Sequence, residues 1–483
     1  MNDLFLGIDL GTGSCKLTLI DAAGRFRDSE SASYPTYSPQ PGWMEQNPED
    51  WISAVSLALR GLLCRVNPAC IKSISLTSAA HIGVLMDRDC RVIRNALLWN
   101  DQRSVAQVQK LRSMADRIYA LTGNSVSTSW TLPHFLWVRE TEPELWKTVR
   151  HICFSKDSIL HWLTGKWVTD PATAVASLLF DINLMSWSAE LCSVLGIPPD
   201  SMCGMLPCVR AADTCAGSIL PQIAAEFGLS AAVSVLTGTL DSATETYGAG
   251  ASKPGDVVIR IGTAGGIHKL SAVPIENRKL LTYPFPKGNI WYSQAGTNAA
   301  GAAVGWAVGL VSEKSGPAFD NFDKAAGSVP PGSENLFFLP FLSGERTPYW
   351  NPDLRGTFLG LSFHHTKAHM ARAVLEGVAY SLTDALQTII SDGELPETVT
   401  VVGGGTKDGL LMKILSSILN RRLSVLPDVD SAYGTALLCL GDVPLQCQSH
   451  TTVIEPDQEW SCFYRNGFTK YKKNCMLIAN VYS

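Results

Sequence analysis

The succession of apolar and polar positions along the chain predicts strands and helices in turn. Apolar runs over residues 4–10 and 15–21 flank a glycine-rich turn and indicate two strands of a meander. A helix is predicted to begin at Pro48, because Asn47 can cap it and apolar residues follow at helical spacing. Residues 71–78 indicate a short buried strand. Together these elements predict an α/β fold with a mixed or parallel sheet.

The pattern near the N-terminus occurs a second time. Residues 257–272 again indicate a strand, a glycine-threonine turn and a strand. Two copies far apart in the chain predict two lobes of similar fold. Small residues and turn formers between Asp241 and Gly255 indicate the boundary, so we expect lobes at residues 1–246 and 247–483. A ligand bound by both turns would lie in the interlobe cleft.

Composition and charge exclude several classes of protein. The 483 residues are 46% hydrophobic and 17% charged, which predicts a globular protein with a sizeable core. A net charge of −5 provides no overall attraction for nucleic acid. No cationic amphipathic stretch or long apolar run indicates a membrane. The 13 cysteines form no CxxC pair, which favours reduced thiols and a cytoplasmic protein.

The first glycine-rich turn combines a carboxylate with backbone amides. Asp9 stands near the end of its strand, followed by Gly11 and Thr12. Glycines let backbone N–H groups approach an anion closely, and a carboxylate beside a phosphate suits Mg²⁺. A plain hairpin turn capped by Asp9 explains this segment equally well.

Two further glycine clusters also follow predicted strands. Gly262 and Thr263 repeat the first turn, and Gly403–Gly405 separates the predicted strand 398–402 from an apolar-faced helix over 410–419. Strand, glycines and helix N-terminus together are typical of a nucleotide site, although the P-loop and dinucleotide motifs are absent from the sequence. A helix-entry loop explains any one cluster, whereas three clusters favour nucleotide binding.

Asp241 lies where the predicted strand 233–239 meets a helix or loop. The residue types allow a helix N-cap at this junction. The alternative is a general base in the cleft, close to the phosphates of a nucleotide.

Several long motifs in the chain resemble those of the FGGY carbohydrate kinases, nearest to their xylulokinase branch. The resemblance runs from about residue 4 to about residue 440. Its most specific part is residues 356–377, where Gly360-Leu361, His369-Met370 and Ala373–Glu376 fit the C-terminal signature of the family. Other similar segments are residues 41–51, 96–104, 339–352 and 401–409.

The resemblance implies two actin-like (ribonuclease H-like) lobes that close around ATP and a sugar. It assigns the catalytic base to Asp241 and the magnesium-associated carboxylate to Asp9. The implied nucleotide-binding residues are Gly11, Thr12, Gly262, Thr263, Gly301, Gly403, Gly404 and Gly405.

The sugar pocket departs from the family pattern. Xylulokinases commonly carry Gln-Met-His where this chain has Ala79-Ala80-His81, and Asp-Asn where it has Asp241-Ser242. The resemblance implies sugar contacts for Ala80, His81, Asp241 and Ser242. A histidine after an apolar strand is often structural, but at this motif position we favour substrate contact by His81.

These observations predict an ATP- and Mg²⁺-dependent kinase that phosphorylates a terminal hydroxyl of a small sugar. D-xylulose is the favoured substrate, and gluconate or a polyol is the alternative within the family. An actin- or chaperone-like ATPase is the alternative from another class, and a catalytically dead sugar-binding regulator is disfavoured because Asp9, Asp241 and all three glycine loops are present. We expect no nucleic-acid or membrane partner, and a homodimer is the one assembly we consider.

Overall fold

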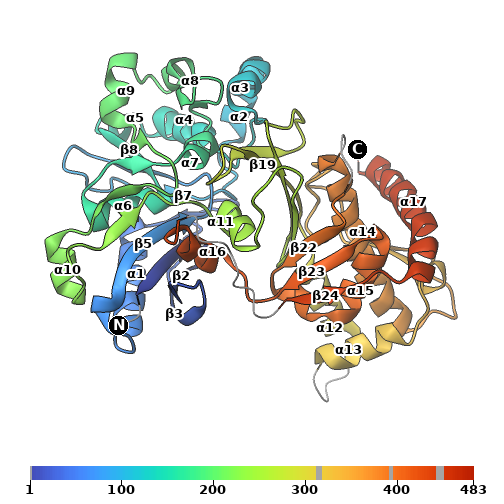
Figure 1. The fold of residues 1–483 in the computed structure, drawn as a ribbon. Coiled ribbons are helices and arrows are strands. Elements are labelled where there is room, and N and C mark those ends of the chain that lie inside the picture. The colour runs from blue at the N-terminus through green and yellow to red at the C-terminus, as the bar shows by residue number, and fades with distance from the viewer. Residues whose placement is uncertain (1–2, 312–317, 391–394, 442–450, 483) are drawn as a thin grey trace. The chain divides into compact units, whose positions relative to one another are not determined.

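The chain forms two compact units (Figure 1). The computed structural model describes residues 3–311, 318–390, 395–441 and 451–482. The first unit comprises Met1–Gly250, Thr282–Trp291 and Asp430–Cys447, and the second comprises Ala251–Leu281, Tyr292–Val429 and Gln448–Ser483. The predicted boundary after residue 246 thus lies beside the end of the long first stretch, and two short later segments join the first unit.

The first unit is built on a mixed sheet of strand order β13-β14-β5-β1-β2-β3, with β15 also paired to β5. These strands are β1 (Leu4–Leu10), β2 (Ser14–Asp21), β3 (Phe26–Ser33), β5 (Ile71–Ser78), β13 (Cys215–Ser218), β14 (Ser234–Leu236) and β15 (Thr239–Leu240). Both pairings β1–β2 and β2–β3 are antiparallel, so the predicted meander is confirmed.

The sheet of the second unit repeats this arrangement. Its strands within this unit follow the order β24-β23-β22-β16-β17-β19, and β16 is antiparallel to β17 but parallel to β22, as β1 is to β2 and β5. The strands are β16 (Val257–Ile261), β17 (Gly265–Ser271), β19 (Trp291–Thr297), β22 (Thr398–Val402), β23 (Arg422–Leu426) and β24 (Thr452–Ile454). The internal repeat seen in the sequence is therefore the start of a duplicated sheet.

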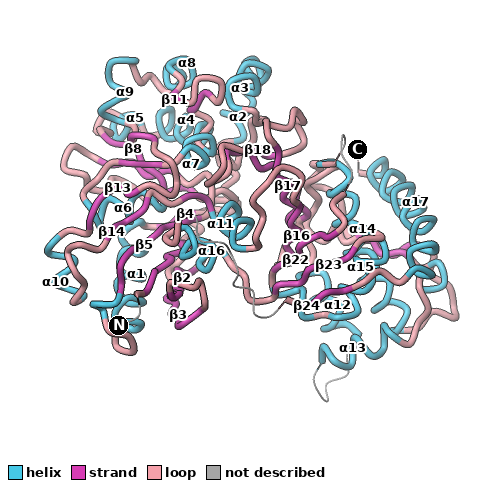
Figure 2. The backbone as a smooth tube through the Cα atoms, viewed as in Figure 1, coloured by secondary structure: helices cyan, strands magenta, loops and turns pink. Residues whose placement is uncertain are grey.

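Helices accompany the sheet in each unit (Figure 2). Those of the first unit are α1 (Pro48–Leu63), α2 (Val105–Leu111), α3 (Ala115–Thr122), α4 (Thr131–Thr141), α5 (Pro143–Trp146), α6 (Ser155–Thr164), α7 (Pro171–Ala176), α8 (Ala189–Val194), α9 (Pro199–Met205), α10 (Pro221–Phe227), α11 (Asp241–Gly248) and α16 (Ser431–Leu438). Those of the second unit are α12 (Gly301–Val311), α13 (Ala318–Gly327), α14 (Lys367–Ile389), α15 (Gly409–Leu419) and α17 (Gln458–Val481). Among the described helices, none has the length and apolarity needed to cross a bilayer.

Local sequence signals explain where α1 begins. The Asn47 side chain accepts a hydrogen bond from the Glu49 N–H, and Pro48 occupies the first turn, where its missing N–H costs nothing. Trp51, Val55 and other apolar residues of one face are buried. The predicted helix start is therefore confirmed.

The strand predicted over residues 233–239 is interrupted. β14 ends at Leu236, Gly238 turns the chain with a φ of 70°, and β15 resumes at Thr239. A Cβ at Gly238 would lie 1.9 Å from the Leu76 carbonyl oxygen, so only glycine fits this close approach. The turn shifts the chain just before Asp241.

The return of α16 to the first unit depends on two close backbone approaches. A Cβ at Gly7 in β1 would lie 2.1 Å from the Ala432 carbonyl oxygen. A Cβ at Gly434 would lie 1.8 Å from the Thr244 carbonyl oxygen in α11. Because neither glycine has a side chain, α16 packs directly against β1 and α11, and Figure 1 shows red α16 beside green α11.

Candidate active site

Three parallel strands of the first unit end at one edge of its sheet. Leu10 at the end of β1 and Leu240 at the end of β15 both pair with Ser78, the last residue of β5. The Ala79 N–H also donates to the Leu10 carbonyl oxygen at 3.1 Å. Because carboxyl ends of parallel strands meet at the same edge, the segments around Asp9, Ala79–His81 and Asp241 are brought together there.

Asp241 is the first residue of α11 rather than its cap. The N-cap position is Leu240, and Asp241 Oδ1 accepts a hydrogen bond from the neighbouring Ser242 N–H at 2.7 Å. Both Asp241 and Ser242 are half-buried. The N-cap interpretation of Asp241 is therefore wrong, and its carboxylate stands in the first turn of a helix, where the helix dipole stabilises negative charge.

Asp9 lies in a strongly acidic part of the first unit. Burial is the largest cause that raises the pKa of Asp9 well above its usual value, and the negative charge of Asp241 is the next. Asp430 and Glu245 raise this pKa further, whereas Lys16 opposes them. Lys16 itself forms an ion pair with Asp430. One lysine thus faces several carboxylates, an arrangement that attracts a cation.

The surroundings of Asp9 fit a metal ion held mainly by other ligands. Asp9 Oδ1 is buried and has no hydrogen-bond partner within the described residues. No group of three or more His, Cys, Asp or Glu side chains in the described part of the chain could form a metal site by itself. Mg²⁺ commonly binds through one or two carboxylates, water and substrate phosphates, so this donor set suits it.

The turn between β1 and β2 is held in place by hydrogen bonds to its backbone. The Gly11 N–H donates to the Ser14 carbonyl oxygen at 3.0 Å, and the Tyr34 hydroxyl donates to the Gly11 carbonyl oxygen. The Gln46 amide donates to the Thr12 carbonyl oxygen at 2.6 Å. Thr12 is exposed, and these contacts hold the turn in one shape.

The His81 ring is buried and held by two aromatic neighbours. It stacks on Trp130 with ring centroids 4.1 Å apart, and its Nε2 lies 2.8 Å from the Tyr283 hydroxyl. Burial, assisted by the nearby His134, lowers the pKa of His81 to about 3, so the imidazole is neutral at physiological pH.

The two alanines before His81 differ in exposure. Ala79 is 6% exposed and belongs to the hydrophobic core, whereas Ala80 is half-exposed. His134 is also buried, on α4, and burial lowers its pKa to about 4. Among these residues, Ala80 is therefore the position where a larger side chain would project most readily toward solvent or a ligand.

In the second unit, the predicted nucleotide residues other than Gly403 line one cavity of about 580 Å³. The cavity is lined by Gly262, Thr263, Gly301, Gly404 and Gly405, together with residues of α13, α15 and the loop before α15. A Cβ at Gly301 would lie 2.6 Å from the Gly262 carbonyl oxygen, and one at Gly405 would lie 2.3 Å from Ile261 Cγ2. These glycines let three backbone segments meet and leave the cavity open.

The loop between β22 and α15 contains a short turn before the helix begins, close to its predicted start at residue 410. Gly403 has a φ of 93°, and a short 3₁₀ turn over Gly404–Lys407 separates it from α15, which Asp408 caps through the Leu411 N–H. Burial, followed by the nearby Asp323 carboxyl, raises the pKa of Asp408 to about 6, although the hydrogen bond from the Leu411 N–H lowers it. Asp323, Lys407 and Asp408 add charged groups to the glycine-lined cavity.

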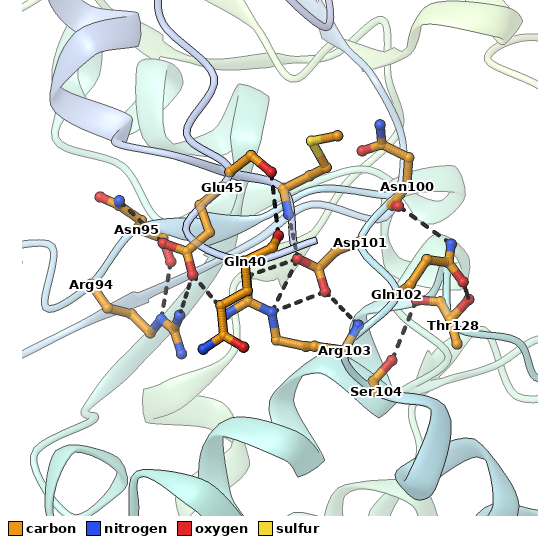
Figure 3. A network of polar contacts seen from close by, with 12 residues as sticks. Gln40, Glu45, Arg94, Asn95, Asn100, Asp101, Gln102, Arg103, Ser104 and Thr128 are labelled. Carbon is orange, nitrogen blue, oxygen red and sulfur yellow. Dashed lines mark hydrogen bonds and ion pairs between the residues drawn. The ribbon is translucent and has the colours of Figure 1, made fainter. Parts of the chain in front are cut away.

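A buried polar network joins two of the motifs that carried the resemblance (Figure 3). Arg103 Nη1 lies 2.6 Å from Glu45 Oε1, and Arg103 Nη2 lies 2.8 Å from Asp101 Oδ2. Arg94 also pairs with Glu45, and the Arg103 guanidinium lies 3.7 Å above the Trp43 ring centroid. The charged groups of these motifs therefore satisfy one another and hold the loop that follows β7 (Ala96–Leu97).

Sequence reasoning missed the residues that hold the site from a distance. Tyr283 comes from the short segment Thr282–Trp291 that returns to the first unit. Trp130 and Lys156 lie in regions where no motif was identified. No local pattern could reveal them, because their partners lie far away in the sequence.

Comparison with known proteins identifies the family. Residues 4–248 match the FGGY family of carbohydrate kinases, N-terminal domain, and residues 257–440 match its C-terminal domain. The chain belongs to the FGGY family of carbohydrate kinases. It is accordingly a sugar kinase with the two-unit ribonuclease H-like fold that the resemblance predicted.

Individual relatives cover nearly the whole chain. The xylulose kinase of Bacillus subtilis is 33% identical over 486 residues, covering 99% of this chain and 96% of the relative. The crystal structure of ligand-bound xylulose kinase from Lactobacillus acidophilus aligns with a TM-score of 0.92 at 25% identity, covering 99% of both chains. The gluconate kinase structure from the same organism aligns with a TM-score of 0.92 at 25% identity, covering 100% of this chain and 99% of the other.

Proposed function

We propose that this FGGY kinase transfers the γ-phosphoryl group of ATP to a terminal hydroxyl of D-xylulose. The observation that carries the proposal is the acidic sheet edge, where Asp241 opens α11 near the raised-pKa carboxyl of Asp9. The choice of xylulose rests on the 33% identity to the Bacillus subtilis xylulose kinase.

Asp241 acts as the general base in this mechanism. Its carboxylate accepts the proton of the sugar hydroxyl while the hydroxyl oxygen attacks the γ-phosphorus. The new bond joins sugar oxygen and phosphorus, the bond from phosphorus to the β–γ bridging oxygen breaks, and ADP leaves with that electron pair. The first-turn position of Asp241 supports the role, because the helix N-terminus favours the ionised carboxylate before the proton arrives.

Asp9 is the residue that would hold Mg²⁺, directly or through water. Bound there, the ion would neutralise charge on the transferring phosphate. The orphaned Asp9 Oδ1 supports this assignment, because a cation would satisfy it. Gly11 and Thr12 in the following turn are the proposed phosphate contacts, with the exposed Thr12 the more accessible of the two because the Gly11 N–H is already donated to the Ser14 carbonyl oxygen.

The cavity of the second unit is proposed to bind the nucleotide. Gly262, Thr263 and Gly301 would surround phosphate, and Gly403–Gly405 would lie against adenosine. The volume of about 580 Å³ supports this proposal, because it falls in the range of small-ligand sites.

For the sugar, Ala80, His81, Asp241 and Ser242 are the proposed contacts. His81 is neutral, so it would act as a hydrogen-bonding group and not as a charge. Its Nε2 already faces the Tyr283 hydroxyl, so a sugar hydroxyl at that nitrogen would have to share or replace this partner.

Gluconate is the second candidate substrate. The structural similarity to the Lactobacillus acidophilus gluconate kinase is as high as that to the xylulose kinase. Ala80 is half-exposed where xylulokinases commonly carry a methionine, which leaves room for a different substrate. An actin-like ATPase is set aside, because both FGGY domains match along the chain.

The decisive experiment measures ADP release with Mg-ATP, with and without xylulose, gluconate and glycerol. The wild type is compared with Asp241→Asn and with Asp200→Asn, which changes an exposed carboxylate on α9. We expect sugar-dependent turnover in the wild type and in Asp200→Asn. Asp241→Asn should lower kcat by about 10²- to 10⁴-fold and leave ATP affinity nearly unchanged. ADP release independent of every sugar, or near-normal turnover in Asp241→Asn, would contradict the proposal.

A further inference from the structure

Three charged side chains lie in the interior of the first unit, outside every predicted site. Lys156 Nζ lies 2.6 Å from Asp157 Oδ1 and 3.1 Å from Asp170 Oδ1, and the three side chains are 0%, 2% and 1% exposed. We call them the buried ion cluster. Removing charges from water costs free energy, and a buried ion pair contributes little net stability. Stability alone therefore does not explain why the cluster is present.

The buried ion cluster contacts the turn that leads into Asp241. Lys156 Nζ donates to the Thr237 carbonyl oxygen at 3.2 Å. The Thr239 hydroxyl donates to Asp170 Oδ2 at 2.6 Å. Thr237 and Thr239 flank Gly238, so the cluster holds both sides of the turn immediately before Leu240 and Asp241.

The cluster is itself held by helix ends. Lys156 and Asp157 lie in the first turn of α6. Asp170 caps α7, where its Oδ2 accepts hydrogen bonds from the Ala172 and Thr173 N–H groups. These contacts leave Asp170 little freedom, so the Thr239 hydroxyl is bound to a fixed point.

A second set of contacts holds the same turn from β5. The Thr77 hydroxyl donates to the Thr239 carbonyl oxygen at 2.7 Å, and Thr239 pairs with Thr77 in the sheet. Gly238 lies directly against Leu76, as its close approach to that carbonyl requires. Thr239 is thus clamped through its carbonyl by β5 and through its hydroxyl by Asp170.

Lys156 keeps its positive charge although it is buried. Burial would lower the pKa of Lys156, but the carboxylates of Asp157 and Asp170 outweigh it and raise that pKa. Lys156 therefore remains an ammonium group that can hold the Thr237 carbonyl.

We propose that the buried ion cluster positions Asp241, with Thr239 as the link between Asp170 and the short strand that leads into the base. The inference rests on the proposed role of Asp241. A general base must lie within hydrogen-bond reach of the proton it accepts, and a displacement of about 1 Å can cost about 100-fold in rate. Lys156, Asp170 and Thr239 are positioning residues, because they act through Asp241 and not on the substrate.

Thr239→Val is the sharpest variant, since it removes one hydroxyl and keeps the shape of the side chain. Asp170 retains its two bonds to the α7 amides, so the cap survives. Thr239→Ser restores the hydroxyl. Thr173→Val is the matched control, because the Thr173 hydroxyl is buried on α7 and has no hydrogen-bond partner in the described ranges.

The measurement is kcat and KM of sugar phosphorylation, with thermal unfolding of each variant. Thr239→Val should lower kcat by about 10- to 100-fold and change both KM values by less than about 2-fold. Thr239→Ser should keep most of the activity, and Thr173→Val should match the wild type. A kcat near the wild-type value in a folded Thr239→Val protein, even with a lower Tm, would overturn the inference.

A double-mutant cycle tests whether the effect passes through Asp241. In the Asp241→Asn background, Thr239→Val should change the residual rate by less than about 2-fold, because the base is already absent. A loss as large as in the wild-type background would overturn the inference. If Thr239→Val does not fold, Thr239→Ala and Thr239→Ser provide the same cycle, and an Ala variant as active as Ser would also overturn it.

The same assay separates this inference from the proposed function. A wild type without sugar-dependent turnover, or an active Asp241→Asn variant, contradicts the proposed base. A normal wild type and an inactive Asp241→Asn protein, combined with an active Thr239→Val protein, contradict only the role of the cluster.

Discussion

The two units present the same hairpin with opposite charge. Asp9 in β1 and Arg260 in β16 both stand two residues before the glycine-threonine turn of their sheets. Asp9 lies among other carboxylates, and of these Asp241 raises the pKa of Asp9 most. The Arg260 guanidinium lies within 3.3 Å of where a Cβ of Gly262 would stand.

The duplicated sheet therefore provides the same edge and turn in both units, and the ligand that each edge can bind depends on individual residues. An acidic edge suits a cation and a proton acceptor. A glycine turn beside a guanidinium suits phosphate. Substitutions at Asp9, Gly301 and Ala80 test this difference between the two units.

Asp9→Asn should have the largest effect, because it removes the carboxylate that distinguishes the first turn. We expect kcat to fall by about 10- to 100-fold and the Mg²⁺ concentration for half-maximal rate to rise. Sugar binding without nucleotide should remain, which isothermal titration measures. Asp200→Asn is the control, and an unchanged magnesium titration with normal turnover would remove Asp9 from the site.

The same variant should change how stability depends on pH. The pKa of Asp9 is raised in the folded protein, so the folded state binds the proton more tightly than the unfolded state does. Wild-type stability should therefore fall as the pH rises from about 4 through this raised pKa, without metal or nucleotide. Asp9→Asn should lack that fall and have the higher Tm at neutral pH. Equal slopes of Tm against pH in both proteins would argue against an acidic edge.

Gly301→Ala should have a smaller effect, confined to the nucleotide. The added Cβ would lie 2.6 Å from the Gly262 carbonyl oxygen, so the phosphate turn must shift. We expect the KM for ATP to rise by about 10-fold and the KM for the sugar to stay unchanged. Gly305→Ala on the same helix is the control, because a Cβ there meets no atom within 4 Å and should stabilise α12. Equal KM values for ATP in both variants would contradict the nucleotide assignment.

Ala80→Met should have the smallest effect and act on substrate choice alone. It restores the residue usual in xylulokinases at a half-exposed position, without burying an amide as Ala79→Gln would. We expect the ratio of kcat/KM for xylulose over gluconate to rise by up to about 10-fold. Ala225→Met, on an exposed position of α10, should leave that ratio unchanged. No change in the Ala80 variant would mean that this position does not face the sugar.

Much of the fold was predictable because its signals are local. The meander over β1–β3 and the start of α1 follow from residues within one turn or one strand of each other. Asp9 and Asp241 were singled out because each stands at or near the end of a predicted strand, and in the fold the charge of Asp241 raises the pKa of Asp9. The N-cap hypothesis for Asp241 failed because Leu240 occupies the cap position and Asp241 is already the first residue of α11.

By itself, the sequence determined the alternation of elements, the repeated hairpin and the glycine turns, since steric limits of the backbone act between near neighbours. Only the tertiary structure decided which distant groups meet. Lys156 lies beside Thr237, Tyr283 beside His81, and α16 beside β1, each across a long stretch of chain. Such pairs depend on the folded path of the whole chain. A contact between distant residues stabilises the fold only after the residues between them have lost conformational entropy.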